Sequence, residues 1–284
     1  MSVRCILAAV GTGPESELAI AQADELARAH GARLLVCHAS PHEFFHAASG
    51  PDTRARLAGE LRAYVGRLTG RTAGEYEVEV REGRTHAAVL ELAERCAAEC
   101  IVVGAGSEGS GAVSDSELRR ILRHAAAPVW IARGRTGTRR VLVGTDFSDP
   151  ALPAVAAAAA ESRRIGGELT ILHSLQLMLS MPVWSATGPV PIDIPPAVQA
   201  QLHADVEERL AAALAQCGAA GQRRVAHGSP AQALLAAARE LEADLVVTGT
   251  LGRTGIPRVL IGSVAEEVAL GAPCSVLVVR LAHV

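Results

Sequence analysis

The stretch "RCILAAVGTGPESELAIAQADELARAHGARLLVCHAS", residues 4–40, decides the fold, because the chain contains a second version of it. That version is "RRVLVGTDFSDPALPAVAAAAAESRRIGGELTILHSL", residues 139–175. Aligned without gaps, the two segments place apolar run over apolar run and His38 over His173. A repeat of this length indicates a repeated structural unit, so we expect one fold to be present twice.

Two later pairs of segments extend the repeat to the end of the chain. "EGRTHAAVLELAERCAAECIVVGAG" (82–106) matches "HGSPAQALLAAARELEADLVVTGT" (227–250), and "APVWIAR" (127–133) matches "APCSVLVVR" (272–280). The second copy also carries a Pro-rich insertion, residues 181–196. We expect a loop there, because proline interrupts both helices and sheet ladders.

Each copy alternates short apolar runs with longer amphipathic segments. Such runs are typical of parallel strands that are covered on both faces. In the first copy they are residues 6–10, 34–37, 78–80, 101–103 and 129–132. Strands that alternate with helices predict a doubly wound α/β fold. The polar segment 133–140, "RGRTGTRR", separates the copies, so we expect domains at residues 1–136 and 137–284.

The composition excludes several classes of protein. A net charge of -3 and a pI of about 6.4 argue against a general nucleic-acid binder, and 2% aromatic residues argue against base-stacking surfaces. The six cysteines are scattered, mostly inside apolar runs, as is usual in a reducing compartment. No apolar stretch is long enough to span a bilayer, and the first residues resemble a strand rather than a signal peptide. We therefore expect a cytoplasmic protein without a membrane or nucleic-acid partner.

The candidate ligand site is "GTLGRTGIPRVLIGS", residues 249–263, which contains two arginines and no acidic residue. It follows the apolar run 245–247, at the end of the sheet where doubly wound folds bind their ligands. Its glycines and serine have the spacing G-x2-G-x9-G-S, formed by Gly249, Gly252, Gly262 and Ser263. Glycine lets backbone N–H groups approach a ligand, and the start of a helix attracts anions. We expect a phosphate there, with Ser263 as the N-cap of a helix and Glu266 as its capping-box partner.

Two better-known phosphate motifs are missing. No lysine precedes Ser263, so the loop is not a P-loop, and no G-x-G-x-x-G follows the first strand of either copy. The alternative without a ligand is that Gly249 and Gly252 only shape a turn, and that Gly262 and Ser263 only cap a helix.

These residues carry a family resemblance. "GTLGRTGIPRVLIGSVAE" (249–266) resembles the nucleotide loop of the universal stress protein family, and "VLVGTDFSD" (141–149) resembles that family's first strand and turn. "HGSPAQALLAAA" (227–238) and "APCSVLVVR" (272–280) are similar to its third strand with the following helix and to its closing strand. The resemblance covers the whole chain and is stronger in the second copy. It implies two tandem Rossmann-like domains of the adenine nucleotide alpha hydrolase-like type. Each would be a five-stranded parallel sheet flanked by helices, and the two would pair through their last strands as an internal pseudo-dimer.

The resemblance also implies that the second copy binds ATP or a related adenine nucleotide, with or without Mg²⁺. The implied binding residues are Gly144, Thr145, Asp146, Ser174, Gly249, Gly252, Arg253, Gly262, Ser263 and Val264. Asp146 would face the ribose or adenine, Ser174 would meet the adenine through its backbone, and the later residues would hold the phosphates. For Asp146, the alternative is a turn or a helix cap formed by "TDFSD".

The first copy departs from this pattern. In a gapless alignment four positions change: Ser107 stands for Gly252, Glu117 for Gly262, Leu118 for Ser263 and Gly11 for Asp146. Its loop also carries Glu108 and Asp115. Each carboxylate would repel a phosphate by about 1 kcal/mol or more. We predict that the first site is empty or altered, the alternative being a shifted mode of binding that uses its remaining glycines.

The sequence thus predicts a stress-response regulatory protein that binds a nucleotide and hydrolyses it slowly at most. We identify neither catalytic residues nor metal ligands, since "HEFFH" (42–46) matches a zinc-protease string without the long helix that string requires. One alternative is a partner-binding scaffold with a vestigial loop, and another is a true ATP hydrolase or nucleotidyl transferase. A homodimer of whole chains stays open beside the internal pairing.

Overall fold

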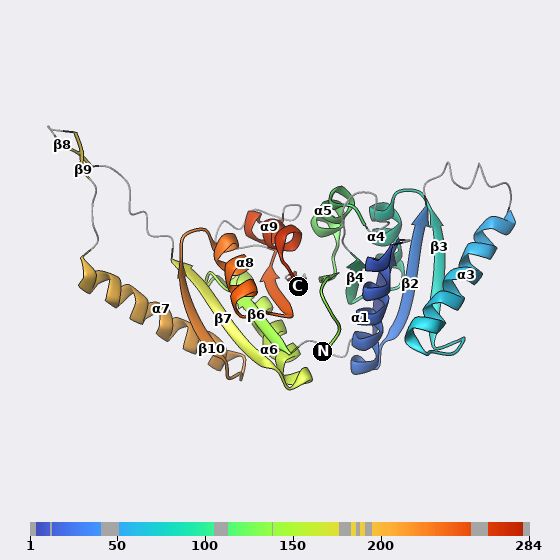
Figure 1. Ribbon diagram of the computed structural model, residues 1–284, viewed down its shortest axis with the longest axis horizontal. Helices are drawn as coiled ribbons and strands as arrows, with labels where there is room; N and C mark the ends of the chain where they lie inside the picture. Colours follow the sequence, from blue (N-terminus) through green and yellow to red (C-terminus); the bar gives the residue numbers. More distant parts are fainter. Residues whose placement is uncertain are drawn as a thin grey trace.

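The computed structural model describes residues 4–11, 13–40, 51–104, 113–137, 139–175, 183–185, 188–190, 195–250 and 261–280. Within these residues, ten strands form one continuous sheet in the order β10-β7-β6-β11-β12-β5-β4-β1-β2-β3 (Figure 1). The first copy supplies one half of this sheet and the second copy the other half, so the repeat in the sequence is a repeat in space.

The first copy alternates strands and helices, as its apolar runs predict. Its elements are β1 (Cys5–Val10), α1 (Pro14–His30), β2 (Arg33–Ser40), α3 (Pro51–Thr69), β3 (Tyr76–Glu82), α4 (Thr85–Arg95), β4 (Cys100–Gly104), α5 (Asp115–His124) and β5 (Val129–Ala132). β1 is buried along its whole length, as expected for a strand covered on both faces. Gly31 ends α1 in the left-handed conformation, which costs glycine little.

The second copy repeats this order with an insertion. Its elements are β6 (Arg140–Gly144), the 3-10 turn η1 (Asp149–Ala151), α6 (Leu152–Ile165), β7 (Glu168–Leu175), β8 (Val183–Ser185), β9 (Gly188–Val190), α7 (Pro196–Gln216), β10 (Gln222–His227), α8 (Pro230–Glu240), β11 (Leu245–Gly249), α9 (Ser263–Gly271) and β12 (Ser275–Val279). Gly166 ends α6 as Gly31 ends α1.

The copies are joined through their last strands. Within the ten-stranded sheet, all strand pairs inside each copy are parallel, whereas β12 pairs with β5 in antiparallel fashion, with Trp130 opposite Leu277. Each of the two hydrophobic clusters, one on either face of the sheet, contains residues of both copies. The expectation of two five-stranded parallel sheets paired as an internal pseudo-dimer is confirmed.

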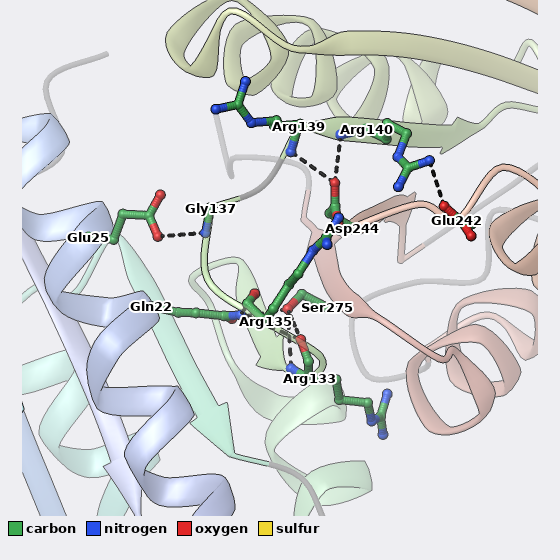
Figure 2. A network of polar contacts seen from close by, with 10 residues as sticks. All are labelled: Gln22, Glu25, Arg133, Arg135, Gly137, Arg139, Arg140, Glu242, Asp244 and Ser275. Atoms are coloured by element: carbon green, nitrogen blue, oxygen red, sulfur yellow. Dashed lines mark hydrogen bonds and ion pairs between the residues drawn. The ribbon is translucent and has the colours of Figure 1, made fainter.

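The segment between the copies is held by polar contacts (Figure 2). The carboxylate of Asp244 accepts hydrogen bonds from the backbone N–H groups of Arg139 and Arg140, at 3.0 and 2.9 Å, and from the guanidinium of Arg135. On the other side, Gly137 N–H donates to Glu25 of α1 at 3.4 Å. The connection is therefore tied to both halves of the molecule.

The Pro-rich insertion differs from the prediction. We expected only loop, but β8 and β9 form a short antiparallel ribbon in which Trp184 is opposite Pro189. A two-stranded ribbon consists only of edges, so the missing N–H of a proline need not interrupt a ladder. Among the described residues, no helix is both long and apolar enough to cross a membrane.

Candidate functional site

A tight turn follows β6 at the carboxyl end of the sheet. Oδ1 of Asp146 accepts hydrogen bonds from the backbone N–H of Ser148, at 3.0 Å, and from its hydroxyl, at 2.5 Å. The hydroxyl of Thr145 accepts the N–H of Phe147 at 3.1 Å. One oxygen of Asp146 therefore stabilises the turn, which is the structural role that the sequence left open beside ligand binding.

Phe147, a residue that the sequence analysis did not single out, occupies the centre of this turn. Its φ of 61° lies in the left-handed region, which a non-glycine residue enters only when its surroundings hold it there. The centroid of the Phe147 ring lies 4.4 Å from that of His173, and the guanidinium carbon of Arg209, on α7, lies 4.2 Å from the Phe147 centroid. His173 in turn contacts the carbonyl of Thr145 through Nδ1 at 2.7 Å. These contacts fix the direction of the turn that carries Asp146.

The neighbouring strand extends past this turn. Gly144, the last residue of β6, pairs with Leu172, whereas β7 continues to Leu175. Ser174 is buried, and its hydroxyl donates to the carbonyl of Gly228 at 2.8 Å. Its side chain is therefore used within the protein, which leaves a backbone contact as the role that the sequence predicts for it.

The start of α9 forms the third part of the site. Thr250, directly after β11, donates its N–H to Val279 at 3.0 Å, and its carbonyl accepts the N–H of Gly262 at 2.7 Å. Both ends of the glycine-rich loop are thus clamped together beside the first turn of α9. A Cβ on Gly262 would lie 3.1 Å from the Thr250 carbonyl oxygen, so close backbone approach favours glycine there.

The predicted capping of α9 is wrong. Gly262 is the N-cap, with φ -63° and ψ 147°, and Ser263 is the first helical residue. The N-cap residue has no side chain that could cap this end, and Glu266 pairs instead with Arg119 and Arg123 of the first copy. Among the described residues, the first N–H groups of α9 therefore receive no cap from a serine or carboxylate at the N-cap, which is the arrangement that suits an external anion.

Eight of the ten implied residues lie in described segments. They end or follow β6, β7 and β11, which are neighbours in the sheet, or begin α9: Gly144, Thr145, Asp146, Ser174, Gly249, Gly262, Ser263 and Val264. Gly252 and Arg253 lie outside the described residues. Gly144 has a packing reason of its own, since a Cβ there would lie 2.7 Å from the Leu234 side chain of α8.

The corresponding end of the first copy is built differently. The helix α5 has Ser114 as its N-cap, and its hydroxyl accepts the N–H of Glu117 at 3.4 Å. The carboxylate of Glu117 accepts the backbone N–H of His86 at 2.5 Å and contacts its Nδ1 at 2.8 Å. The chain's own side chains thus occupy the positions that an anion would need.

This geometry corrects the gapless alignment of the two loops. Ser114 stands ten residues after Gly104, whereas Gly262 stands thirteen residues after Gly249. Ser114 and not Glu117 therefore takes the place of Gly262 as N-cap, because the loop of the first copy is shorter and α5 is one residue longer than α9. Gly11, the counterpart of Asp146, donates its N–H to the hydroxyl of Ser16 at 2.9 Å.

An open groove of about 690 Å³ lies along the side of α9. Its lining residues are Arg119, Gln232, Leu235, Ile261, Ser263, Glu266, Glu267, Leu270 and Gly271. The carboxylates of Glu266 and Glu267 in this lining would repel a phosphate. Residues 42–46, with the zinc-protease string, lie outside the described residues.

Comparison with known proteins identifies the family. The universal stress protein family model matches the chain twice, at residues 3–133 and 137–280. The chain belongs to the universal stress protein family. It is 30% identical to a universal stress protein of Mycolicibacterium smegmatis over 97% of the chain and 96% of that relative. A universal stress protein of Thermus aquaticus is 33% identical over 50% of the chain and 98% of its own length.

A solved structure of similar size supports the same fold. A universal stress protein from Archaeoglobus fulgidus aligns over 99% of both chains with a TM-score of 0.65 at 19% sequence identity. At this identity the likeness concerns the fold alone, two tandem universal stress protein domains with Rossmann-like architecture.

Proposed function

We propose that this universal stress protein is a regulatory protein that binds ATP, or a related adenine nucleotide, in its second copy. The observation that carries the proposal is the start of α9, where the N-cap is a glycine and no cap hydrogen bond from a side chain is formed among the described residues. Free N–H groups and the positive end of the helix dipole favour phosphate oxygens at such a position.

The rest of the site suits the base and ribose. The turn after β6 presents Asp146, and Ser174 lies on the part of β7 that continues beyond the last residue paired with β6. Family membership supports the same assignment, because the motif residues that resemble the family's nucleotide loop are those that gather here. Gly252 and Arg253 are proposed as phosphate contacts from the sequence alone.

We further propose one nucleotide per chain, because Ser114, Asp115 and Glu117 surround the start of α5. We also propose that residues 1–136 and 137–284 are the two domains, and that only the second of them binds a nucleotide. No base positioned for hydrolysis is identified besides Asp146, so turnover should be well below about 1 s⁻¹. A location in the cytoplasm is proposed from the composition.

Equilibrium binding of labelled ATP to the full chain tests the proposal, with Mg²⁺ present and absent. We expect saturation at one ATP per chain and competition by ADP and AMP. Saturation at two would contradict the empty first site. No binding at millimolar ATP would overturn the proposal and favour the partner-binding scaffold, and steady turnover at an ordinary enzyme rate would favour a true hydrolase.

A further inference from the structure

The contact between the two copies, which we call the seam, consists of β5 and α5 on one side and β12 and α9 on the other. Trp130 of β5 lies opposite Leu277 of β12. The neighbouring pairs, Ile131 with Val276 and Val129 with Val278, lie on either side of this central pair. The pseudo-twofold axis therefore passes between Trp130 and Leu277, which are equivalent positions of the two copies. The helices obey the same symmetry. The C-cap N–H of Ala125 donates to the carbonyl of Ile121 in α5, and the C-cap N–H of Ala272 donates to the carbonyl of Val268 in α9.

One set of seam contacts is symmetric. Arg133 follows β5 and donates to the carbonyl of Ala269 in α9 at 2.5 Å. Arg280 follows β12 and donates to the carbonyl of Leu122 in α5. Each arginine thus binds the C-terminal end of the other copy's last helix, where a cation is favourable. Two identical copies could make the same contacts, so these arginines do not select a partner.

The charges next to the axis are unlike. Arg119 and Glu266 stand six residues before their respective C-caps, so they are equivalent positions, and they form an ion pair with each other. Arg123 adds a second contact to Glu266 at 3.4 Å. Two first copies would place Arg119 against Arg119, and two second copies would place Glu266 against Glu266. Figure 1 shows α5 and α9 side by side at the middle of the molecule.

The two side chains at the pseudo-twofold axis, those of Trp130 and Leu277, also differ in volume. Trp130 is buried, and Leu277 packs against the same hydrophobic cluster, so both side chains lie on one face of the sheet. Directly opposite residues in an antiparallel pair share their space. Two tryptophans would overfill that space and two leucines would leave part of it empty, and both changes destabilise a packed core.

A buried amide adds a third asymmetry (Figure 2). Oε1 of Gln22, on α1, accepts the indole N–H of Trp130 at 2.7 Å and the hydroxyl of Ser275 at 3.0 Å. Its Nε2 donates to the carbonyl of Arg135 at 2.8 Å, at the connection between the copies. In the repeat alignment Ala157 is the equivalent of Gln22, so the second copy cannot make this bridge.

We propose that the seam selects unlike halves: the first copy is shaped and charged to pair with the second copy and not with another first copy. The partner that this surface accepts is therefore the other half of the same chain. The surface that could otherwise join two chains through their last strands is used internally. The proposal does not depend on nucleotide binding.

A charge swap in the full chain tests the proposal. We expect Arg119→Glu, and separately Glu266→Arg, to lower the melting temperature by about 2–4 °C, and the double variant to recover most of that loss. The loss in each single variant should shrink in 1 M salt, because salt screens like charges. Arg120→Glu is the matched control, since Arg120 is exposed on the same helix, and it should change the melting temperature less than Arg119→Glu does.

A size swap tests the same proposal without charges. Trp130→Leu and Leu277→Trp should each destabilise the chain, and the pair together should be more stable than the sum of the single effects predicts. Light scattering should show no dimer of wild-type chains that forms through the seam. Any dimer that it detects should therefore persist in Arg119→Glu and in Glu266→Arg. Additive losses in both double variants, or losses of Arg119→Glu that salt leaves unchanged and Arg120→Glu reproduces, would overturn the proposal.

Discussion

The two helices that follow the fourth strand of each copy begin in the same way and differ in what occupies their first turn. Both loops are closed by a backbone hydrogen bond, from Val113 to Gly104 at 3.0 Å and from Gly262 to Thr250 at 2.7 Å. At α5 a serine caps the helix and two carboxylates follow, whereas at α9 the cap is a glycine. The comparison shows two similar loop closures that lead into first helical turns of different chemistry, and we propose that this difference decides which copy accepts an anion.

The largest expected effect comes from making the second site resemble the first. Gly262→Glu should weaken ATP binding at least about 100-fold, because it adds a Cβ close to Thr250 and a negative charge where phosphates would lie. Isothermal titration calorimetry on the full chain measures this loss. The matched control is Ser114→Glu, at the corresponding position of the first copy, which should leave ATP affinity unchanged. Equal loss in both variants would place the nucleotide elsewhere.

A second comparison concerns the residues just before the fourth strands. Asp244 accepts hydrogen bonds from two backbone N–H groups and from Arg135, whereas the carboxylate of its counterpart Glu99 accepts the N–H of Arg4 at 3.0 Å. Asp244→Ala should lower the free energy of unfolding by about 1–3 kcal/mol, because the part-buried N–H groups of Arg139 and Arg140 and the guanidinium of Arg135 lose their shared acceptor. Glu99→Ala should cost less than about 1 kcal/mol, which urea denaturation of both variants can distinguish.

The effect of Asp244 should depend on pH. Burial alone would raise the pKa of this carboxyl, but hydrogen bonds from Arg140, Arg139 and Arg135 outweigh it and lower the pKa below the ordinary 3.8. Its stabilising contribution is therefore complete above that value and is lost as the pH falls through the lowered pKa. The difference between wild type and Asp244→Ala should shrink below pH 3.8, and a difference that grows on acidification would contradict the assignment.

Asp146 should show a smaller effect that separates its two roles. Asp146→Asn keeps an oxygen acceptor for the N–H of Ser148, whereas Asp146→Ala removes it. If the carboxylate only forms the turn, Asn should retain ATP affinity and Ala should lower it about tenfold. We expect both variants to lose affinity, with Ala the weaker, because a ligand contact and the turn are both affected. Calorimetric titration and the melting temperature of each variant measure the two roles separately.

The smallest effect at neutral pH comes from the buried thiols. Burial raises the pKa of Cys37 and Cys100 from 9.0 to about 12, so both thiols stay protonated in the folded chain. The unfolded chain releases these protons at lower pH, so stability should fall as the pH rises from about 9 toward 12. Urea denaturation at pH 8 and pH 10.5 measures this slope. Cys100→Ala should flatten it, and an unchanged slope would assign the alkaline loss to other groups.

Much of the fold could be predicted because the repeat and the apolar runs act over long stretches. All five runs of the first copy are strands, and the pairing of the copies follows from the resemblance of the closing strands. The β8–β9 ribbon could not be predicted, since it consists of short edge strands with a proline and no periodic pattern. The composition of this segment could not predict the ribbon, because the ribbon is defined only by the pairing of β8 with β9.

The candidate site was predicted less completely. Glycine spacing located α9, but the N-cap was placed one residue late, because Glu266 forms contacts with another part of the chain that no local motif reveals. The shorter loop of the first copy was hidden, since a gapless alignment cannot detect a difference in loop length among glycines and serines. Phe147 and Arg209 were missed because they are distant in sequence and meet only in the fold. The positive φ of Phe147 had no signal in its residue type.

Trp130 gives the seam an optical property. It is one of two tryptophans in the chain, is 3% exposed, and holds its indole N–H against a single amide that also binds the other copy. Parting of the two halves would expose that ring to water and shift its emission to longer wavelength, so the protein carries an intrinsic fluorescent reporter at its own centre. With Trp184 replaced by Phe, this signal would follow the opening of the central sheet in real time, without any attached dye.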